Sequence, residues 1–403
     1  MKIAVWHNLP SGGGKRALYD HVRGLLKRGH TVEAWCPPTA DKKYLPLSEL
    51  LPEHVVELAW SGPQRQSERW GITSRTKRLL HAMDAHCRIC AEQIATGGFD
   101  VLFANTCMLL RTTSIGRFSK VPSVLYLQEP FRCLYEALPR LPWLAPRIDV
   151  TATGLRTWLL DRRDMRNKRL QAREEVDNVA EFDRVLVNSY YSRESVLRAY
   201  GLDADVCYLG IDTGHFVPKH LPKQDYVVGF GSITLGKNLR FCIEAVAQTT
   251  PPHPKLIWIG NVAIPSHLQE MQALAADRGV VFEPKVGISD DDVLDTLSRA
   301  LVMIYAPRLE PFGLAPLEAN ACGVPVLAVA EGGVRETVID KVNGLLVDSN
   351  PPAMGAAIQR LRDDPAFAGR LGAAGRVAVE TKWGLEQAID RLEWHLLKCS
   401  GTQ

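Results

Sequence analysis

Short apolar runs alternate with amphipathic stretches of helical period along most of the chain. Residues 2–7 form the first apolar run, and residues 17–28 then repeat leucine and valine at helical spacing before Gly29. Residues 31–36 form the next apolar run. This succession predicts a β-α-β unit, which is the building block of a parallel sheet.

The same alternation continues in two series. Further strands of the first series are predicted at residues 101–103, 123–127 and 185–188. A stretch with two prolines and mixed charge, residues 216–225, separates them from a second series. Its predicted strands are 226–231, 255–260, 280–285, 301–306 and 325–330, and its predicted helices are 238–248, 267–278, 290–299 and 315–321.

Two such series predict an α/β protein with two doubly wound, Rossmann-like domains that face a central cleft. We expect one domain at 1–215, a second domain at 216–380, and a final helix at 381–403 that returns to the first domain. A chain of 403 residues has room for two cores. Ligands of such sheets bind beyond the carboxyl ends of the strands.

Composition narrows the class of protein. No run of about 20 apolar residues is present and the first residues do not resemble a signal peptide, so we expect a cytoplasmic protein. Nine scattered cysteines fit reduced thiols. Cys87 and Cys90 form a lone C-x-x-C, which is more typical of a buried helix face than of a metal or redox site.

The charge is distributed unevenly. Residues 1–200 carry 30 Lys and Arg against 21 Asp and Glu, whereas the remainder carries 18 against 24. A basic first half indicates that it meets something anionic.

Two glycine-rich turns follow predicted strands. At residues 12–14, three glycines can let a ligand approach the backbone, and the following helix offers unpaired N–H groups. A tight turn without a ligand explains the same residues. In the second series, Gly231 ends a strand and Lys237 follows at a helix start, where it can meet a diphosphate. A solvated surface lysine is the alternative.

The most informative stretch follows the strand at 301–306. Glu310 lies in the predicted loop, Gly313 opens a helix, and Glu318 lies on that helix. A glutamate can accept both hydroxyls of a ribose, and amides near 312–314 can bind phosphate oxygens. A charged loop with an acid near a helix start is the structural alternative.

The segment EPFGLAPLEANACGVPV…GG…E resembles the E-x7-E signature of the retaining GT-B glycosyltransferases of glycosyltransferase family 4. Three other segments resemble the family's first loop and helix, its interdomain segment and its phosphate-binding turn. They are SGGGKRALYDHVRGLLKRGHTV, RVLVNSYYSRESVLRAYGLDADVCYLGIDTGHF and GSITLGKN. The four landmarks occur in the expected order and cover nearly the whole chain.

The resemblance implies that the domain at 1–215 binds the acceptor and that the domain at 216–380 binds the nucleotide sugar, and it implies roles for the matching residues. Lys237 would neutralise the donor diphosphate, Glu318 would hold the ribose, and Glu310 would contact or position the transferred sugar. The backbone of three residues would face the phosphate or sugar, namely Phe312, Gly313 and Leu314. Gly13 and Gly14 of the other domain would close over the donor phosphates.

Two positions depart from the family pattern. Where the family has arginine after Gly231, this chain has Ser232, and we consider Arg308 or Lys15 as the replacement for that phosphate cation. Where many members have histidine, this chain has Gln128 followed by Glu129. A neutral glutamine cannot act as a general base, but it can hydrogen-bond a sugar hydroxyl, so both residues remain candidates for the catalytic site.

Three aspartates at 290–292 contain a D-x-D, which metal-dependent transferases of the GT-A fold use. They follow Ser289 and precede a helical run, where acids cap a helix. We therefore expect no metal and no cofactor besides the donor. Positive groups and a helix dipole would stabilise the departing diphosphate.

Basic and apolar residues are interleaved at 140–173, where nine Lys and Arg face three Asp. Together with 65–78, which includes Trp70, this stretch suits the surface of an anionic membrane. A basic exposed helix with core tryptophans is the alternative. No nucleic-acid-binding module is visible. If the membrane interpretation holds, the protein lies peripherally at the inner face of the membrane.

We therefore expect a retaining, metal-independent glycosyltransferase. It would move a hexosyl-type group from a nucleoside diphosphate sugar to a hydroxyl of a glycan, lipid or small molecule. Retention is implied by the resemblance. Two alternatives are a nucleotide-sugar epimerase of the same fold and a non-catalytic sugar-nucleotide binder.

Overall fold

The computed structural model describes residues 1–60, 75–137, 141, 143–145 and 152–401. The chain forms two compact units. Unit 1 comprises Met1–Asn188, Ser192–Cys207 and Ile389–Gln403, and unit 2 comprises Ser189–Tyr191 and Tyr208–Ala388.

Unit 1 is built on a parallel sheet, which has seven strands within the described residues. Their order is β3-β2-β1-β4-β5-β6-β7. The bounds are β1 Lys2–Asn8, β2 Thr31–Cys36, β3 Glu53–Val55, β4 Val101–Cys107, β5 Ser123–Tyr126, β6 Arg184–Val187 and β7 Asp205–Val206. The central strands β1 and β4 are almost entirely buried, as expected for a sheet covered on both faces.

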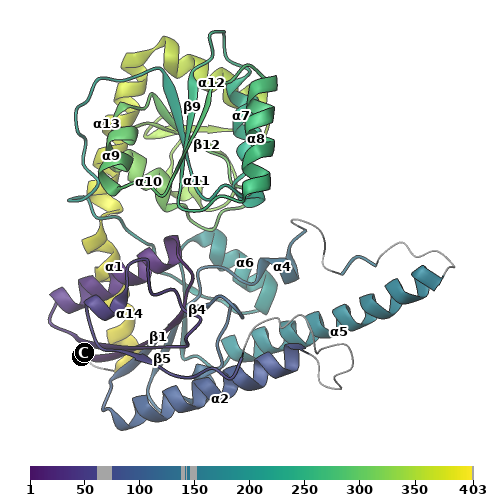
Figure 1. Ribbon diagram of the computed structural model, residues 1–403. Helices are drawn as coiled ribbons and strands as arrows, with labels where there is room; N and C mark the ends of the chain where they lie inside the picture. Colours follow the sequence, from purple (N-terminus) through teal and green to yellow (C-terminus); the bar gives the residue numbers. More distant parts are fainter. Residues whose placement is uncertain (61–74, 138–140, 142, 146–151, 402–403) are drawn as a thin grey trace. The chain divides into compact units, whose positions relative to one another are not determined.

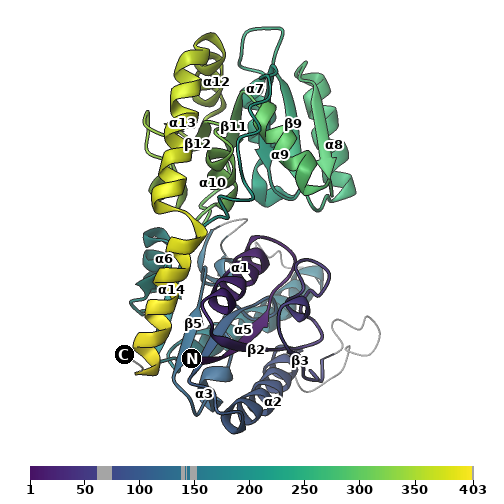
Figure 2. The ribbon, with the colours of Figure 1, turned by 90° about the vertical axis from the view of Figure 1, so that its left-hand side faces the viewer.

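Helices cover both faces of this sheet. Their bounds are α1 Gly13–Lys27, α2 Arg75–Thr96, α3 Ile115–Phe118, α4 Arg132–Tyr135, α5 Ala152–Val179, α6 Tyr190–Tyr200 and α14 Leu385–Ser400, with a short 3-10 turn at Leu47–Glu49. Helices α1 and α14 lie on one face, and α2, α3 and α5 lie on the other (Figures 1 and 2). Cys87 and Cys90 lie on the buried face of α2, as the sequence predicted.

The last helix completes unit 1. From Ile389 onward, α14 packs with residues from the start of the chain. Ile389 lies directly against Gly24 of α1. Glu393 accepts a hydrogen bond of 2.6 Å from Arg28 and lies 2.6 Å from the His30 ring nitrogen Nε2.

Unit 2 repeats the architecture. Within the described residues its parallel sheet has six strands, in the order β10-β9-β8-β11-β12-β13. The strands are β8 Tyr226–Phe230, β9 Lys255–Gly260, β10 Phe282–Val286, β11 Val302–Tyr305, β12 Val326–Val329 and β13 Gly344–Val347. The helices are α7 Leu239–Val246, α8 Pro265–Asp277, α9 Asp290–Arg299, α10 Leu314–Ala321, α11 Val334–Thr337, α12 Pro351–Asp363 and α13 Pro365–Lys382, with a 3-10 turn at Leu235–Lys237.

The helices of unit 2 again form two layers. Helices α7, α8 and α12 lie on one face of the sheet, and α9, α10 and α13 lie on the other (Figure 1). The doubly wound arrangement predicted from the sequence is thus confirmed in each unit. No helix in the described part of the chain is long and apolar enough to cross a membrane.

Candidate functional site

Each sheet has a point where the strand order reverses. In unit 2, β8 lies between β9 and β11, so the chain leaves β8 and β11 in opposite directions. In unit 1, β1 lies between β2 and β4 in the same way. Loops diverge at such a point and leave room for a ligand beyond the carboxyl ends of the strands. The candidate residues follow these strands.

The turn after β8 positions Lys237. Gly231 has φ +133°, and a Cβ added there would lie 2.9 Å from Cγ of Lys237, so the lysine stem crosses the glycine. Asn238, at φ 56°, donates from Nδ2 to the carbonyl of Ala306 at 3.1 Å. This bond ties the turn to the end of β11. The absence of a side chain at Gly231 therefore leaves room for the Lys237 side chain, as well as for a possible ligand.

Lys237 and Glu310 form an ion pair. Nζ of Lys237 donates to Oε2 of Glu310 at 2.9 Å, and the two side chains remain 29% and 24% exposed. The structure thus brings together the two residues that the resemblance assigns to the donor diphosphate and to the transferred sugar. Both remain accessible from solvent.

Gly313 forms the turn between Glu310 and α10. Its φ of +90° is unfavourable for other residues, and a Cβ there would lie 3.0 Å from the phenol oxygen of Tyr305. Helix α10 begins at Leu314 without a side-chain cap. Its first N–H groups are therefore available to an anion. Phe312 is buried beside Trp383, with ring centroids 5.8 Å apart.

Two carboxylates and one phenol share this end of the sheet. Glu318 lies on α10 with only 5% of its surface exposed. Burial, reinforced by Glu310 and Glu318, raises the pKa of Tyr305 well above its usual value. Tyr305 therefore stays a neutral donor beside both acids. Tyr305 was not among the residues predicted from the sequence, although it is the last residue of β11.

The Glu310 loop is held from both sides. Its Glu310 carbonyl accepts from the Gly333 amide at 2.9 Å, and its Pro311 carbonyl accepts from Oγ of Ser189 at 2.6 Å. Glu336 in turn accepts from the Tyr190 and Tyr191 amides at 3.0 and 2.9 Å. The family-like GG…E and NS segments thus act as supports for this loop.

The two candidate replacement cations differ in environment. Arg308 is 47% exposed and donates from Nε to Glu331 at 2.7 Å. Lys15 is fully buried in unit 1, and its Nζ has no hydrogen-bond partner among the described residues. Ser232 is half-buried in the β8 turn. Only Arg308 presents its charge at the surface, and it lies in the same unit as Lys237.

In unit 1, Gln128 and Glu129 follow β5. The Gln128 amide lies against Gly14, where an added Cβ would come within 3.2 Å of both its terminal atoms. Glu129 pairs with Arg111 at 3.0 Å and lies 4.0 Å from Arg132. The glutamine is thus close to the first glycine turn, whereas the Glu129 carboxylate is neutralised by arginine.

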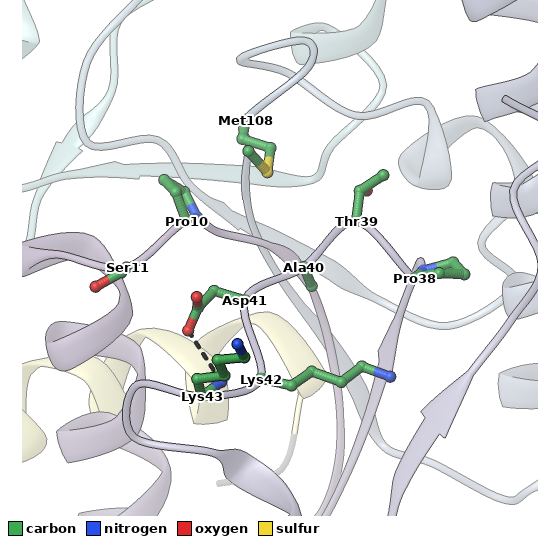
Figure 3. A pocket seen from close by; sticks show the side chains of 9 residues that line it. All are labelled: Pro10, Ser11, Pro38, Thr39, Ala40, Asp41, Lys42, Lys43 and Met108. Atoms are coloured by element: carbon green, nitrogen blue, oxygen red, sulfur yellow. Dashed lines mark hydrogen bonds between the residues drawn. The ribbon is translucent and has the colours of Figure 1, made fainter. Parts of the chain in front are cut away.

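A hollow of about 420 Å³ lies at the carboxyl ends of β1, β2 and β4 in unit 1. Its lining consists of Pro10, Ser11, Pro38, Thr39, Ala40, Asp41, Lys42, Lys43 and Met108 (Figure 3). Thr39 donates to Asn8 at 3.0 Å, and the Asn8 carbonyl accepts from the Met108 amide at 2.7 Å. These bonds tie the loops around the hollow to β1. This hollow was not predicted from the sequence.

His7, Cys36 and Glu53 bring possible metal-ligating atoms within 4.8 Å of one another. Nε2 of His7 lies 3.0 Å from Glu53, and burial raises the pKa of Cys36 to about 12. Glu53 also interacts electrostatically with the buried Lys15. A protonated thiol and a neighbouring ammonium fit a buried charge network better than a metal site.

The three aspartates begin a helix, as the sequence predicted. Oγ of Ser289 accepts from the Asp292 amide at 3.2 Å and caps α9. Asp291 and Asp295 pair with Lys219 at 3.2 and 2.6 Å. The cap begins the helix, and the ion pairs with Lys219 attach it to the preceding chain.

The fold matches solved glycosyltransferases along the whole chain. Anabaena HepE, solved in complex with UDP and glucose, superposes with a TM-score of 0.71 at 18% identity over 99% of this chain and 100% of that one. Sucrose-phosphate synthase from Thermosynechococcus elongatus gives 0.72 at 20% identity over 100% of both chains. Two doubly wound units of this kind define the GT-B class.

The family follows from the sequence. Residues 11–215 match the model described as Glycosyltransferase Family 4, and residues 211–378 match Glycosyl transferases group 1. The first match alone covers half of the chain. The protein belongs to glycosyltransferase family 4, and the resemblance noted from its motifs is confirmed.

Curated relatives match over part of their length. D-inositol 3-phosphate glycosyltransferase of Xylanimonas cellulosilytica is 30% identical over 52% of this chain and 55% of its own. Human alpha-1,3/1,6-mannosyltransferase ALG2 is 27% identical over 60% of this chain and 65% of its own. The match thus spans between half and two thirds of these relatives.

Proposed function

We propose that the protein transfers a sugar from a nucleoside diphosphate sugar to a hydroxyl, with retention of configuration. The observation that carries the proposal is the cluster of Lys237, Glu310 and Glu318 around the open start of α10. It offers a cation and free amides for a diphosphate, and carboxylates for ribose and sugar hydroxyls.

The proposed chemistry proceeds on one face of the donor sugar. The acceptor oxygen bonds to the anomeric carbon as the bond from that carbon to the diphosphate oxygen breaks. The acceptor proton passes to the departing diphosphate. Lys237, Arg308 and the α10 amides would stabilise the developing negative charge, in place of a metal ion. Gln128 would orient the acceptor hydroxyl.

The donor can be identified by thermal shift with UDP, GDP, ADP and dTDP sugars, because a ligand stabilises the state that binds it. We expect one nucleotide series to raise the Tm, and begin with UDP because HepE was solved with it. Glu318→Ala should abolish that shift, whereas Glu386→Ala, at the start of α14, should leave it intact. Equal shifts in both variants would contradict the ribose role of Glu318.

Transfer itself needs a second readout. Incubation of the donor with a panel of glycan, lipid and small-molecule acceptors should give a glycoside of unchanged anomeric configuration. Epimerised donor in the absence of acceptor would favour an epimerase. Donor binding without turnover on any acceptor would favour a non-catalytic binder. Activity that persists in EDTA would support the metal-independent mechanism, and loss of activity restored by Mg²⁺ would refute it.

We further propose that the acceptor is membrane-associated and that α5 contacts an anionic membrane at the inner face. The first half of this 28-residue helix extends away from the sheet of unit 1 (Figure 1). Leu155 and Leu159 are 60% and 55% exposed, and Arg162 and Arg166 are exposed one and two turns further. Leucine and arginine on one exposed surface suit the boundary between headgroups and acyl chains.

The structure describes only part of the remaining basic region. Residues 65–74, Arg140 and Arg147 lie outside the described residues. Trp143 and Trp158 are partly exposed, so neither is the buried core tryptophan of the alternative interpretation. Arg162 stacks over Trp158 at 4.7 Å.

Flotation with vesicles of phosphatidylglycerol and phosphatidylcholine tests this contact. We expect the protein to float at low salt, and the quadruple variant Leu155→Ser, Leu159→Ser, Arg162→Glu, Arg166→Glu to remain at the bottom. The matched control is Leu197→Ser with Arg198→Glu on α6, which are also exposed. No flotation of the unmodified protein, or equal loss in the control, would end the proposal.

A further inference from the structure

The hollow of unit 1 at β1, β2 and β4 carries more positive than available negative charge. Asp41 is its one acidic lining residue. Its Oδ1 accepts from the amides of Lys43 and Tyr44 at 3.2 and 2.8 Å, and the first of these bonds is drawn in Figure 3. The Asp41 carboxylate is therefore occupied in hydrogen bonds to the backbone of its own turn.

The two lysines that line the hollow, unlike Asp41, extend into solvent. Lys42 and Lys43 are exposed, and neither ammonium group forms an ion pair with a described residue, although Lys42 interacts electrostatically with Glu53. In Figure 3 their side chains leave the same turn in different directions. Two exposed lysines without an ion-pair partner among the described residues are suited to an anion with several oxygens.

A third lysine lies close to this rim. Lys15 is fully buried, and its Nζ has no hydrogen-bond partner among the described residues. Burial lowers its pKa, and its electrostatic interactions are with Glu53 first and then with Cys36, Asp41 and Lys42. Because Glu53 already accompanies Lys15, the charge available to a ligand is that of the exposed Lys42 and Lys43.

The amino-terminal end of α1 contributes further positive electrostatic potential to the hollow. Ser11 lines the hollow, and α1 begins two residues later with Gly12 as an N-cap that forms no side-chain hydrogen bond. The first amides of a helix carry partial positive charge. The volume of about 420 Å³ suits a small molecule or a headgroup.

We propose that this hollow binds a phosphate group carried by the acceptor, with Lys42 and Lys43 as its specificity-determining residues. The inference rests on the proposed glycosyl transfer and adds the chemical class of the acceptor. The donor cluster of Lys237 and Glu318 lies in unit 2 and contains none of these lysines. Acceptor phosphate and donor diphosphate are thus bound by different side chains.

The test measures phosphate binding without turnover. Calorimetric titration at low salt would use glycerol 3-phosphate, the soluble short-chain lipid dihexanoylphosphatidylglycerol, and uncharged glycerol. We expect one or both phosphate probes to bind and glycerol not to bind. The double variant Lys42→Ala, Lys43→Ala should bind the phosphate probe at least tenfold more weakly.

A matched control removes the same charge elsewhere in unit 1. Lys27 ends α1 and Lys120 precedes β5, so both stand at the amino-terminal edge of the sheet, opposite the hollow. Lys27→Ala with Lys120→Ala should bind the probes within about twofold of the unmodified protein. Equal weakening in this control would show a general charge effect and overturn the proposal, as would unchanged binding by Lys42→Ala, Lys43→Ala.

The two probes identify the source of the phosphate. Binding of glycerol 3-phosphate alone indicates a soluble phosphomonoester, and binding of the lipid indicates a phospholipid or lipid-linked acceptor. No binding of either probe to the unmodified protein would refute the inference. A thermal shift with the donor nucleotide is the separate arm: its loss in every protein would contradict the proposed function, whereas its loss only in Lys42→Ala, Lys43→Ala would assign the lysines to the donor.

Discussion

The Nζ of Lys237 lies 2.9 Å from Oε2 of Glu310, although the two residues are 73 positions apart. The partner that orients Lys237 is therefore one of the acids expected to meet the sugar. A bound diphosphate would compete with Glu310 for the same ammonium group. If Lys237 binds the donor diphosphate as proposed, this pair would couple donor binding to the position of Glu310.

Removing the lysine charge should weaken catalysis more than folding. Lys237→Met is expected to lower kcat/KM by about 10²–10³, because a charge that stabilises the departing diphosphate is lost. Steady-state kinetics and a melting curve measure the two effects. Lys255→Met is the control, since Lys255 forms a similar 2.9 Å pair with Glu283 at the other end of the unit 2 sheet. Equal kinetic losses in both variants would contradict the assignment.

Gly313→Ala should damage the donor site through the backbone. Its φ of +90° and the nearby Tyr305 oxygen predict a cost of about 1–3 kcal/mol. We expect a raised donor KM and a lowered Tm. Gly369→Ala on α13 meets open space and should be neutral or stabilising. A Gly313→Ala protein with normal donor KM would show that the turn tolerates a side chain.

Glu336 should be a structural anchor of unit 2. Besides the two tyrosine amides, it accepts from the phenol of Tyr208 at 2.8 Å. Glu336→Ala leaves these donors without their acceptor and should cost about 2–3 kcal/mol, seen as a lower Tm. Glu194→Ala, at a 70% exposed position, should change the stability by less than about 0.5 kcal/mol. Similar losses in the two variants would exclude the anchor role.

Unit 1 should become more stable on mild acidification through Glu175. Burial raises the pKa of Glu175 to about 7, against amide donors at Arg111 and Thr112 that favour its charged form. The folded state therefore binds the proton below about pH 7 and the unfolded chain only below about 4.5. Stability from this group increases as the pH falls between those values and is lost as it rises.

Glu175→Gln isolates that contribution, because other titrating groups are common to both proteins. The free energy of unfolding of the unmodified protein minus that of Glu175→Gln, from denaturant titrations, should be larger at pH 5 than at pH 8, by an amount on the order of 2 kcal/mol. A difference that does not change with pH would rule out the shifted pKa.

The sequence predicted the central strands of both sheets to within a few residues. Buried parallel strands such as β11 and β12 are continuous apolar runs, which stand out from their neighbours. Strands β3 and β7, with three and two residues, lie at the edges of the sheet and were missed. The position of such a short strand is determined by its pairing with a neighbouring strand, and the local sequence does not encode that pairing.

Site chemistry was predictable where a motif fixes both partners. Glu310, Gly313 and Glu318 lie within one loop and helix, so their proximity follows from the chain. Lys15 shows the limit: its position beside three glycines suggested a replacement for the missing phosphate cation, and the sequence did not indicate that its side chain is buried. Its environment depends on Glu53 and Asp41, which come from other loops, and no local pattern encodes that packing.

The course of α14 determines how this protein can be recombined with its relatives. The helix starts in unit 2 and from Ile389 belongs to unit 1. A chimera that joins unit 1 of one protein to unit 2 of another by a single crossover would pair Gly24 of α1 with a foreign residue in place of Ile389. A chimera that exchanges unit 2 as a whole therefore requires two crossover points, one near residue 208 and another near residue 388.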